Sequence, residues 1–368
     1  MTVVGTRPEI IRLSSTIKLL DNQEAVEHIL VHTGQNYDYE LNQIFFEDLE
    51  LRAPDYYLEA AKESAVKTIG TSMIHIEDVI TKEKPEAFLV LGDTNSALTA
   101  IVAKKYKIPI FHMEAGNRCF DERVPEETNR KIVDHIADMN LPYSSIAREY
   151  LLAEGISADR IIKTGSPMYE VIHANLEKIK SSSVLRKLNL SQNKYFLVSS
   201  HREENVDDTE KLTEFTHVLN ALVEHYNLPI LFSTHPRTLD RIKKLNLRLS
   251  KSIIVHKPFS FTDYCHLQMN AKAVMSDSGT ISEESSILGL KSLNIRESHE
   301  RPEAMEEGTV MMVGYSKDRI LQGLSILESP LETREVYDYK YPNVSNTVLN
   351  AIVSYTNYVQ QFKGISIL

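Results

Sequence analysis

Apolar residues in this chain follow two patterns, short unbroken runs and longer stretches with helical spacing. Residues 87–91 read AFLVL and residues 195–198 read YFLV, which is typical of strands buried on both faces of a parallel sheet. Between such runs the apolar positions share one helix face, as Ile69, Met73 and Ile76 do. Repeated alternation of buried strands and amphipathic helices predicts an α/β fold with doubly wound, parallel sheets.

This alternation appears twice along the chain. The two series are separated by residues 168–193, a stretch that is helical and then polar and serine-rich, as a linker between domains would be. A last helical pattern, Val344 to Phe362, is expected to pack back on the first series. We predict two Rossmann-like domains, one formed by residues 1–166 with a C-terminal helix at 350–368, the other by residues 167–349.

Composition and charge exclude some classes of binding partner and indicate a cellular compartment. The 368 residues carry a net charge of −10, which argues against nucleic acid or an acidic membrane surface as the main partner. The two cysteines, Cys119 and Cys265, lack metal-type spacing, and the chain has neither a membrane-length apolar run nor a signal-peptide pattern. We therefore expect a soluble protein of the reducing cytoplasm.

Polar side chains collect where the predicted strands of the first half end. Asp93 directly follows one buried strand, and Glu114 follows the next strand along the chain. Glu126 opens the following helix, and Arg130 lies four residues later on the same helix face. Because ligands bind at the carboxyl ends of strands in open α/β sheets, this group suits acid–base chemistry beside an anion. The structural alternatives are a helix cap for Asp93 and a surface ion pair between Glu126 and Arg130.

The first turn of the chain, GTRPE at residues 5–9, joins a strand to a helix. Thr6 suits the N-cap and Pro8 suits the first helical turn. Such a turn points backbone N–H groups at an anion, and Arg7 and Arg12 would add positive charge there. The residues fit a phosphate-binding turn and a well-capped helix equally well.

The second half offers a further set of polar residues after strands. Ser278, Gly279 and Thr280 open a helix and present backbone donors and hydroxyls suited to a diphosphate, although an ordinary helix cap has the same composition. About one turn later, Glu284 is placed to accept hydrogen bonds from ribose hydroxyls. Arg301 is a candidate for bidentate phosphate binding.

Two histidines, His201 and His235, also follow strands of the second half. Polar groups at strand ends of both domains are expected to face each other across an interdomain cleft. A sugar nucleotide fits this distribution, with its diphosphate and nucleoside on the second domain and its sugar among the carboxylates of the first. Neither a G-x-G-x-x-G after the first strand nor a zinc or P-loop motif occurs, so we predict neither NAD nor a metal.

Seven short motifs, in this order, resemble the non-hydrolysing UDP-N-acetylglucosamine 2-epimerase family along nearly the whole chain. They are GTRPE at 5–9, LGDTN at 91–95, HMEAG at 112–116, PEETNR at 125–130, HREEN at 201–205, SDSGTISEE at 276–284 and ERPEA at 300–304. The resemblance implies a glycosyltransferase-B arrangement of the two domains, a homodimer and no dissociable cofactor. It also implies elimination of UDP to a 2-acetamidoglycal, followed by its re-addition after protonation of C2 on the other face.

The same resemblance implies roles for individual residues. Its catalytic residues match Asp93, Glu114, Glu126 and His201. Its substrate- and UDP-binding residues match Arg7, Arg130, Ser278, Gly279, Glu284 and Arg301. Arg12 stands where the family often has lysine. We add Thr280 and His235 to this binding group because of their positions in the sequence. We predict that Glu114 and Glu126 divide the acid–base work, that Asp93 orients, and that His201 helps UDP to leave.

Two departures from the commonest family sequences suggest the sugar. Residues 114–121 read EAGNRCFD where common members begin EAGLRT, and residues 201–204 read HREE where they have HRRE. Both are similar to the branch that converts UDP-2-acetamido-2,6-dideoxy-L-talose to UDP-N-acetyl-L-fucosamine for capsule or O-antigen synthesis, which is the predicted function. The alternative is a UDP-N-acetylglucosamine 2-epimerase. A glycosyltransferase of this fold or an inactive UDP-sugar-binding protein stays open, although the full set of catalytic residues argues against inactivity.

Overall fold

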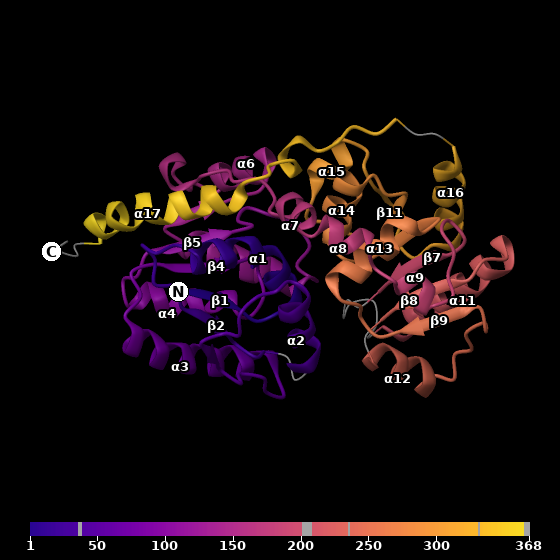
Figure 1. Ribbon diagram of the computed structural model, residues 1–368, viewed down its shortest axis with the longest axis horizontal. Helices are drawn as coiled ribbons and strands as arrows, with labels where there is room; N and C mark the ends of the chain where they lie inside the picture. Colours follow the sequence, from indigo (N-terminus) through magenta and orange to yellow (C-terminus); the bar gives the residue numbers. More distant parts are fainter. Residues whose placement is uncertain (36–38, 201–207, 235, 330–331, 364–368) are drawn as a thin grey trace. The chain divides into compact units, whose positions relative to one another are not determined.

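A computed structural model describes residues 1–35, 39–200, 208–234, 236–329 and 332–363 of the chain (Figure 1). The chain divides into two compact units, Met1–Ala174 with Asp338–Leu368, and Asn175–Tyr337. The first division lies inside the helical stretch predicted as the linker, and the second lies just before the last helix.

The first unit is organised by a six-stranded parallel sheet in the order β3-β2-β1-β4-β5-β6. Its strands are β1 (Thr2–Val4), β2 (Leu30–His32), β3 (Tyr56–Tyr57), β4 (Phe88–Leu91), β5 (Ile110–Met113) and β6 (Met139–Leu141). The strand order reverses between β1 and β4, and in open α/β sheets ligands bind at the carboxyl ends of the strands beside such a reversal. The turns after β1, β4 and β5 carry the candidate residues predicted for this half.

Helices pack around this sheet. They are α1 (Arg7–Asp21), α2 (Tyr39–Asp48), α3 (Ala65–Glu83), η1 (Ala97–Thr99), α4 (Ala100–Lys105), α5 (Pro125–Ile136), α6 (Ser145–Ala153), η2 (Ala158–Arg160), α7 (Met168–Ala174) and α17 (Val344–Phe362). The last helix, α17, packs against α1 (Figure 1). Lys363, just after α17, donates to Asp138 Oδ2 at 2.6 Å and to the Ile108 carbonyl at 3.0 Å, which fastens the end of the helix to the sheet.

The second unit repeats the architecture. Its parallel sheet has the order β12-β11-β10-β7-β8-β9, which is again the doubly wound order with its reversal between β7 and β10. The strands are β7 (Phe196–Ser199), β8 (Ile230–Ser233), β9 (Ile253–His256), β10 (Ala273–Ser276), β11 (Ser292–Asn294) and β12 (Met311–Met312). The predicted fold class, two doubly wound α/β domains, is confirmed.

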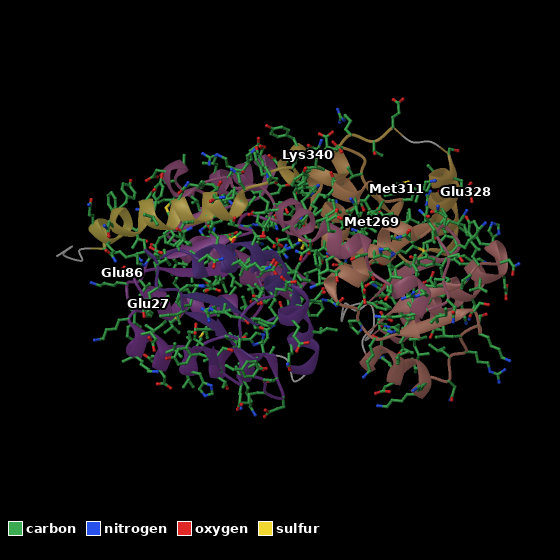
Figure 2. The ribbon with its side chains drawn as sticks, viewed as in Figure 1. Glu27, Glu86, Met269, Met311, Glu328 and Lys340 are labelled. Carbon is green, nitrogen blue, oxygen red and sulfur yellow. The ribbon has the colours of Figure 1, made fainter. Side chains whose placement is uncertain are left out.

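The helices of this unit precede, connect and follow its strands. They are α8 (Leu176–Lys180), α9 (Val184–Lys187), α11 (Thr209–Tyr226), α12 (Pro236–Lys244), α13 (Phe261–Asn270), α14 (Thr280–Leu288), α15 (Pro302–Glu306) and α16 (Lys317–Glu328), and the short η3 (Tyr337–Tyr339) spans the division between the two units. Glu328, labelled in Figure 2, ends α16 and pairs with Lys272 beside β10 at 3.0 Å. Among the residues that the structure describes, no helix has the length and apolar character needed to cross a membrane.

The edge strand β12 was not predicted from the sequence. It has only two residues, Met311 and Met312, and neither is buried (Figure 2). Two adjacent apolar residues show no alternation of polar and apolar positions, which is the signal by which a strand is recognised.

Candidate active site

The turn after β4 presents Asp93 to Arg130 of α5. Arg130 donates to Asp93 Oδ2 from Nε at 3.0 Å and from Nη2 at 2.6 Å, and its Nη1 donates to Glu127 at 2.9 Å. The Arg130 side chain is 3% exposed and that of Asp93 is 22% exposed, so this ion pair is largely withdrawn from water. Asn129 Nδ2 also donates to the Asp93 carbonyl at 2.9 Å. The Asp93 carboxylate is therefore held in one orientation, while the assignment of Arg130 to the sugar nucleotide stays a prediction.

The turn after β5 holds Glu114 in a strained conformation. Its φ of +64° lies in the left-handed region, which residues other than glycine adopt at a cost and which is enriched at functional sites. The buried Arg12 of α1 forms an ion pair with the Glu114 carboxylate, and Asn117 Nδ2 donates to its other oxygen at 3.3 Å. One distant partner, Arg12, and one local partner, Asn117, thus fix the direction of this carboxylate.

Glu126, in the first turn of α5, differs from Asp93 and Glu114, whose carboxylates are held by other side chains. It is partly exposed and, among the described residues, has no hydrogen-bond or ion-pair partner. The surface ion pair with Arg130, which the spacing also allowed, does not form because Arg130 is bound to Asp93 and Glu127 instead. Glu126 shares its helix face with Arg130 and so lies on the side of α5 that faces the Asp93 turn. It is the carboxylate available to a bound ligand.

The first turn of the chain is a capped helix start. Glu9 Oε2 accepts hydrogen bonds from the backbone N–H groups of Gly5 at 2.8 Å and Thr6 at 2.7 Å. Its other oxygen accepts from Thr94 Oγ1 at 2.7 Å, which ties this turn to the turn that follows β4. These two N–H groups are satisfied within the protein, as in a well-capped helix, and a role of this turn toward a phosphate stays a prediction. Arg7, the first residue of α1, remains partly exposed.

Burial gives Glu9 a pH-dependent effect on stability. Burial raises its pKa from 4.5 to about 7, against the opposing hydrogen bonds from Thr94, Gly5 and Thr6. A carboxyl with a raised pKa stabilises the fold fully below pH 4.5 and loses that contribution as the pH rises through 7. From pH 5 to pH 8 we expect the wild-type free energy of unfolding to fall by roughly 2 to 3 kcal/mol more than that of Glu9→Gln. Urea unfolding at both pH values measures the difference, and parallel pH profiles would contradict the raised pKa.

The residues that hold the loop between β5 and α5 were missed by the sequence analysis. Glu127 is 1% exposed, and its carboxylate accepts from the backbone N–H of Cys119 at 3.1 Å and of Phe120 at 3.3 Å. Burial raises the pKa of Cys119 to about 11, so this residue is a protonated thiol at neutral pH rather than a nucleophile. The spacing of Glu127 three residues before Arg130 was the available signal, but the same spacing occurs on solvated helix surfaces.

Gly116 allows this loop to pass close to α6. Its φ is +81°, and a Cβ built on it would lie 2.3 Å from the Ala147 carbonyl oxygen. Gly116→Ala is therefore expected to lower the free energy of unfolding by about 2 to 4 kcal/mol, through backbone strain and overpacking. Gly70→Ala, in the middle of α3 with open space around it, is the control and is expected to be stabilising by about 0.5 to 1 kcal/mol. Equal effects in urea unfolding would contradict this account of Gly116.

In the second unit, the turn after β10 leads into α14. Gly279 occupies the N-cap position, and Ser278 Oγ lies 2.9 Å from Thr280 Oγ1. Glu284, one turn into the helix, accepts from Gln268 Nε2 at 2.6 Å, and Arg301 is buried with Nη2 3.6 Å from Glu283.

These residues gather beside the reversal point of the second sheet, where the sequence predicted a diphosphate site. Gln268 and Glu283 were not among the predicted residues. The predicted His201 and His235 lie outside the described residues. Within the described ranges, no cluster of three or more His, Cys, Asp or Glu side chains is arranged to hold a metal ion.

Sequence comparisons identify relatives along most of the chain. A family model described as UDP-N-acetylglucosamine 2-epimerase matches residues 18–353. A UDP-N-acetylglucosamine 2-epimerase of Methanocaldococcus jannaschii is 37% identical over 333 residues, which are 88% of this chain and 91% of the relative. A UDP-2,3-diacetamido-2,3-dideoxy-D-glucuronate 2-epimerase of Pseudomonas aeruginosa is 34% identical over 88% of this chain and 90% of the relative.

Solved structures give the same result. The structure of UDP-N-acetylglucosamine 2-epimerase from Rickettsia bellii is 49% identical with a TM-score of 0.92, covering 98% of this chain and 97% of its own. The Methanocaldococcus jannaschii enzyme in complex with UDP-GlcNAc and UDP is 34% identical with a TM-score of 0.90, covering 96% and 99%. A Rickettsia africae glycosyltransferase, 16% identical with a TM-score of 0.55, shares the fold alone. The chain therefore belongs to the UDP-N-acetylglucosamine 2-epimerase family, and it is a UDP-sugar 2-epimerase of the isomerase class.

Proposed function

We propose that this enzyme epimerises C2 of UDP-2-acetamido-2,6-dideoxy-L-talose to give UDP-N-acetyl-L-fucosamine, in the synthesis of a capsule or O-antigen. The observation that carries the choice of sugar is the contact of Asn117 with Glu114, at 3.3 Å. Common family members resemble this chain but have leucine at that place, and leucine has no hydrogen-bond donor to offer the carboxylate. A polar contact beside the residue that acts on C2 fits a changed sugar at the site.

The reaction removes the C2 proton and breaks the bond between C1 and the UDP oxygen, and both changes are then reversed with the proton delivered to the other face. Glu114 follows β5 and Glu126 opens α5, so the two carboxylates suit proton transfer on opposite faces of the sugar. Glu114 is paired with Arg12 and is therefore assigned the ionised role of base. Glu126 is available to a ligand and is assigned to the opposite face. Asp93, clamped by Arg130, is assigned to orient the sugar.

A C2–H bond is weakly acidic, so its cleavage needs assistance from the departure of UDP. We assign the diphosphate to Ser278, Gly279 and Thr280 at the start of α14 and to Arg301, because helix N-termini and guanidinium groups stabilise phosphate charge. Glu284 is assigned to the ribose. Arg7, His201 and His235 complete the assignment.

The second candidate sugar is UDP-N-acetylglucosamine, which the relatives from Methanocaldococcus jannaschii and Rickettsia bellii carry in their names. Names at this level of identity do not settle the sugar, because the Pseudomonas aeruginosa relative, 34% identical, is named for a diacetamido-glucuronate. The two candidates differ at C6, where one sugar has a methyl group and the other a hydroxymethyl group, and in ring configuration, which is L-talo in one and D-gluco in the other.

Proton NMR in D₂O with purified enzyme tests the proposal. Deuterium at C2 together with a new epimer from the 6-deoxy-L-talose derivative, and not from UDP-N-acetylglucosamine, is the expected result. Exchange from UDP-N-acetylglucosamine alone would transfer the assignment to the second candidate. A lack of exchange with either would favour a glycosyltransferase or an inactive binding protein and would remove the acid–base roles.

We also propose a cytoplasmic homodimer. Both cysteines are free thiols, which fits a reducing compartment. Two large apolar side chains on α3, Val66 and Ile74, are 79% and 64% exposed and offer a surface for a second copy. Sedimentation equilibrium measures the assembly, and a monomer at all concentrations would contradict the homodimer.

A further inference from the structure

His112 lies in the middle of β5, where every other residue is apolar. Its side chain has no exposed surface, and its strand partners are Val90 of β4 and Asn140 of β6. One ring nitrogen, Nε2, lies 2.7 Å from the Gly92 carbonyl oxygen. The other, Nδ1, lies 2.9 Å from Asp134 Oδ1, within ion-pair distance of a protonated ring although not aligned for a hydrogen bond. Buried polar groups without a structural or functional reason are rare, so this one calls for an explanation.

The surroundings of the ring favour its charged form. A carbonyl oxygen only accepts, so Nε2 carries a proton, and Nδ1 faces a carboxylate oxygen. Burial alone would lower the pKa of His112, but Asp134 and the Gly92 carbonyl outweigh it and raise the pKa above its ordinary value. Asp93 adds a further negative charge from the β4 turn, and Arg118 lies on the far side of Asp134. His112 is thus placed as an imidazolium between two acceptors.

The first acceptor belongs to the Asp93 turn. Gly92 has a φ of +71°, and its N–H donates to the Met113 carbonyl at 3.0 Å, so the residue is bonded to β5 at its amide and through His112 at its carbonyl. That carbonyl is part of the peptide group joining Gly92 to Asp93. Its orientation sets where the Asp93 side chain begins.

The second acceptor belongs to the Glu114 turn. Asp134, fully buried on α5, accepts from the Gly116 N–H with both oxygens at 3.2 Å and from Arg118 Nη1 at 2.7 Å. Gly116 lies two residues after Glu114, at the end of the strained turn. Asp134 also follows Arg130 by four residues, so it sits on the helix face that carries Glu126. The pair of His112 and Asp134 therefore joins β4, β5 and α5 behind the carboxylates.

We propose that His112 is a positioning residue of this epimerase, an imidazolium that, with Asp134, holds the Gly92–Asp93 turn and the Glu114–Gly116 turn in one fixed arrangement. The proposal rests on the roles proposed above for Asp93 and Glu114. It assigns His112 no contact with the substrate, and its effect passes through the backbone of the two turns.

Two substitutions separate the bonds that His112 makes. The amide nitrogen of glutamine reaches about as far as Nε2, so His112→Gln can keep the bond to the Gly92 carbonyl. The shorter asparagine reaches about as far as Nδ1 and keeps only the contact with Asp134. Since displacement of reacting groups by about 1 Å can reduce rates about a hundredfold, we expect His112→Asn to lower kcat about 10- to 100-fold with little change in KM. His112→Gln is expected to recover part of this loss, because it keeps the bond to the Gly92 carbonyl but neither the positive charge nor the contact with Asp134.

The control is His75→Asn on α3, a histidine whose Nδ1 lies 2.6 Å from the Leu58 carbonyl oxygen. It should leave kcat unchanged. Equal kcat in His112→Asn and wild type, or equal losses in the asparagine and glutamine variants, would overturn the positioning role. Asp93→Asn tests the underlying roles separately: if it retained wild-type turnover, the proposed function of Asp93 would fail whatever the His112 variants do.

The protonation state of His112 is measured on the wild-type enzyme, and a variant serves only to identify the resonance. In ¹⁵N NMR of histidine-labelled protein at neutral pH, both His112 nitrogens are expected to give imidazolium shifts. Asp134→Asn identifies the resonance by altering it. A neutral His112 ring in the wild-type enzyme would overturn the charged pair on which the proposal is built.

Discussion

Replacing Glu126 by glutamine is expected to reduce turnover about a thousandfold and to leave the fold and UDP binding intact, because a proton-transferring side chain typically contributes a factor of about 10² to 10⁴. The fold should be unaffected since Glu126, among the described residues, has no partner to lose. UDP binding should be unaffected because the residues proposed for UDP lie mainly in the second unit. Because Glu126→Gln replaces only one carboxylate oxygen by an amide nitrogen, a loss of turnover at unchanged stability can be attributed to lost proton transfer.

Turnover, C2 deuterium incorporation, UDP affinity and the urea midpoint together test this expectation. Glu122→Gln is the matched control, because Glu122 is an exposed glutamate in the loop leading into the same helix. It should behave as the wild type in all four measurements. Wild-type turnover and C2 exchange in Glu126→Gln would remove Glu126 from the acid–base pair, and the unpaired carboxylate would need another role.

The location of the candidate residues could be predicted from sequence because it depends on local patterns. Buried apolar runs identified β4 and β5, and a polar residue directly after such a run must lie at the carboxyl edge of the sheet. The structure places Asp93 and Glu114 there, with Glu126 at the start of α5. The fold class followed from the same alternation of strand and helix.

The partners of these residues could not be predicted, because they come from distant parts of the chain. Arg12 pairs with Glu114 across 102 positions and Thr94 bonds to Glu9 across 85. Local spacing favoured Glu126 as the partner of Arg130, yet the strand order brings Asp93 to it. A histidine inside an apolar strand, such as His112, gave no sign of its partner on α5. Sequence patterns thus indicated which residues lie at the site, and tertiary packing decides which of them are held and which are available.

A large effect on stability is expected from Arg118→Met. The Arg118 side chain is fully buried, donates to Glu154 from Nε at 2.7 Å and Nη2 at 2.6 Å, and donates to Asp134 from Nη1 at 2.7 Å. Methionine fills a similar volume but leaves Asp134, also fully buried, without its guanidinium partner. Breaking a buried ion pair by removing one member typically lowers stability by about 3 to 5 kcal/mol. His112 still faces Asp134, so we expect the lower end, about 3 kcal/mol.

Arg123→Met makes the same substitution five positions along the same loop and serves as the control. The Arg123 side chain is 71% exposed and pairs with Asp121 at the surface, where such pairs contribute about 0 to 1 kcal/mol. Urea midpoints of the two variants should therefore differ widely, and similar midpoints would show that the buried network does not stabilise the loop. If Arg118→Met instead lost turnover at an unchanged midpoint, Arg118 would act by positioning the Glu114 turn through Asp134 and Gly116 rather than by stabilising the fold.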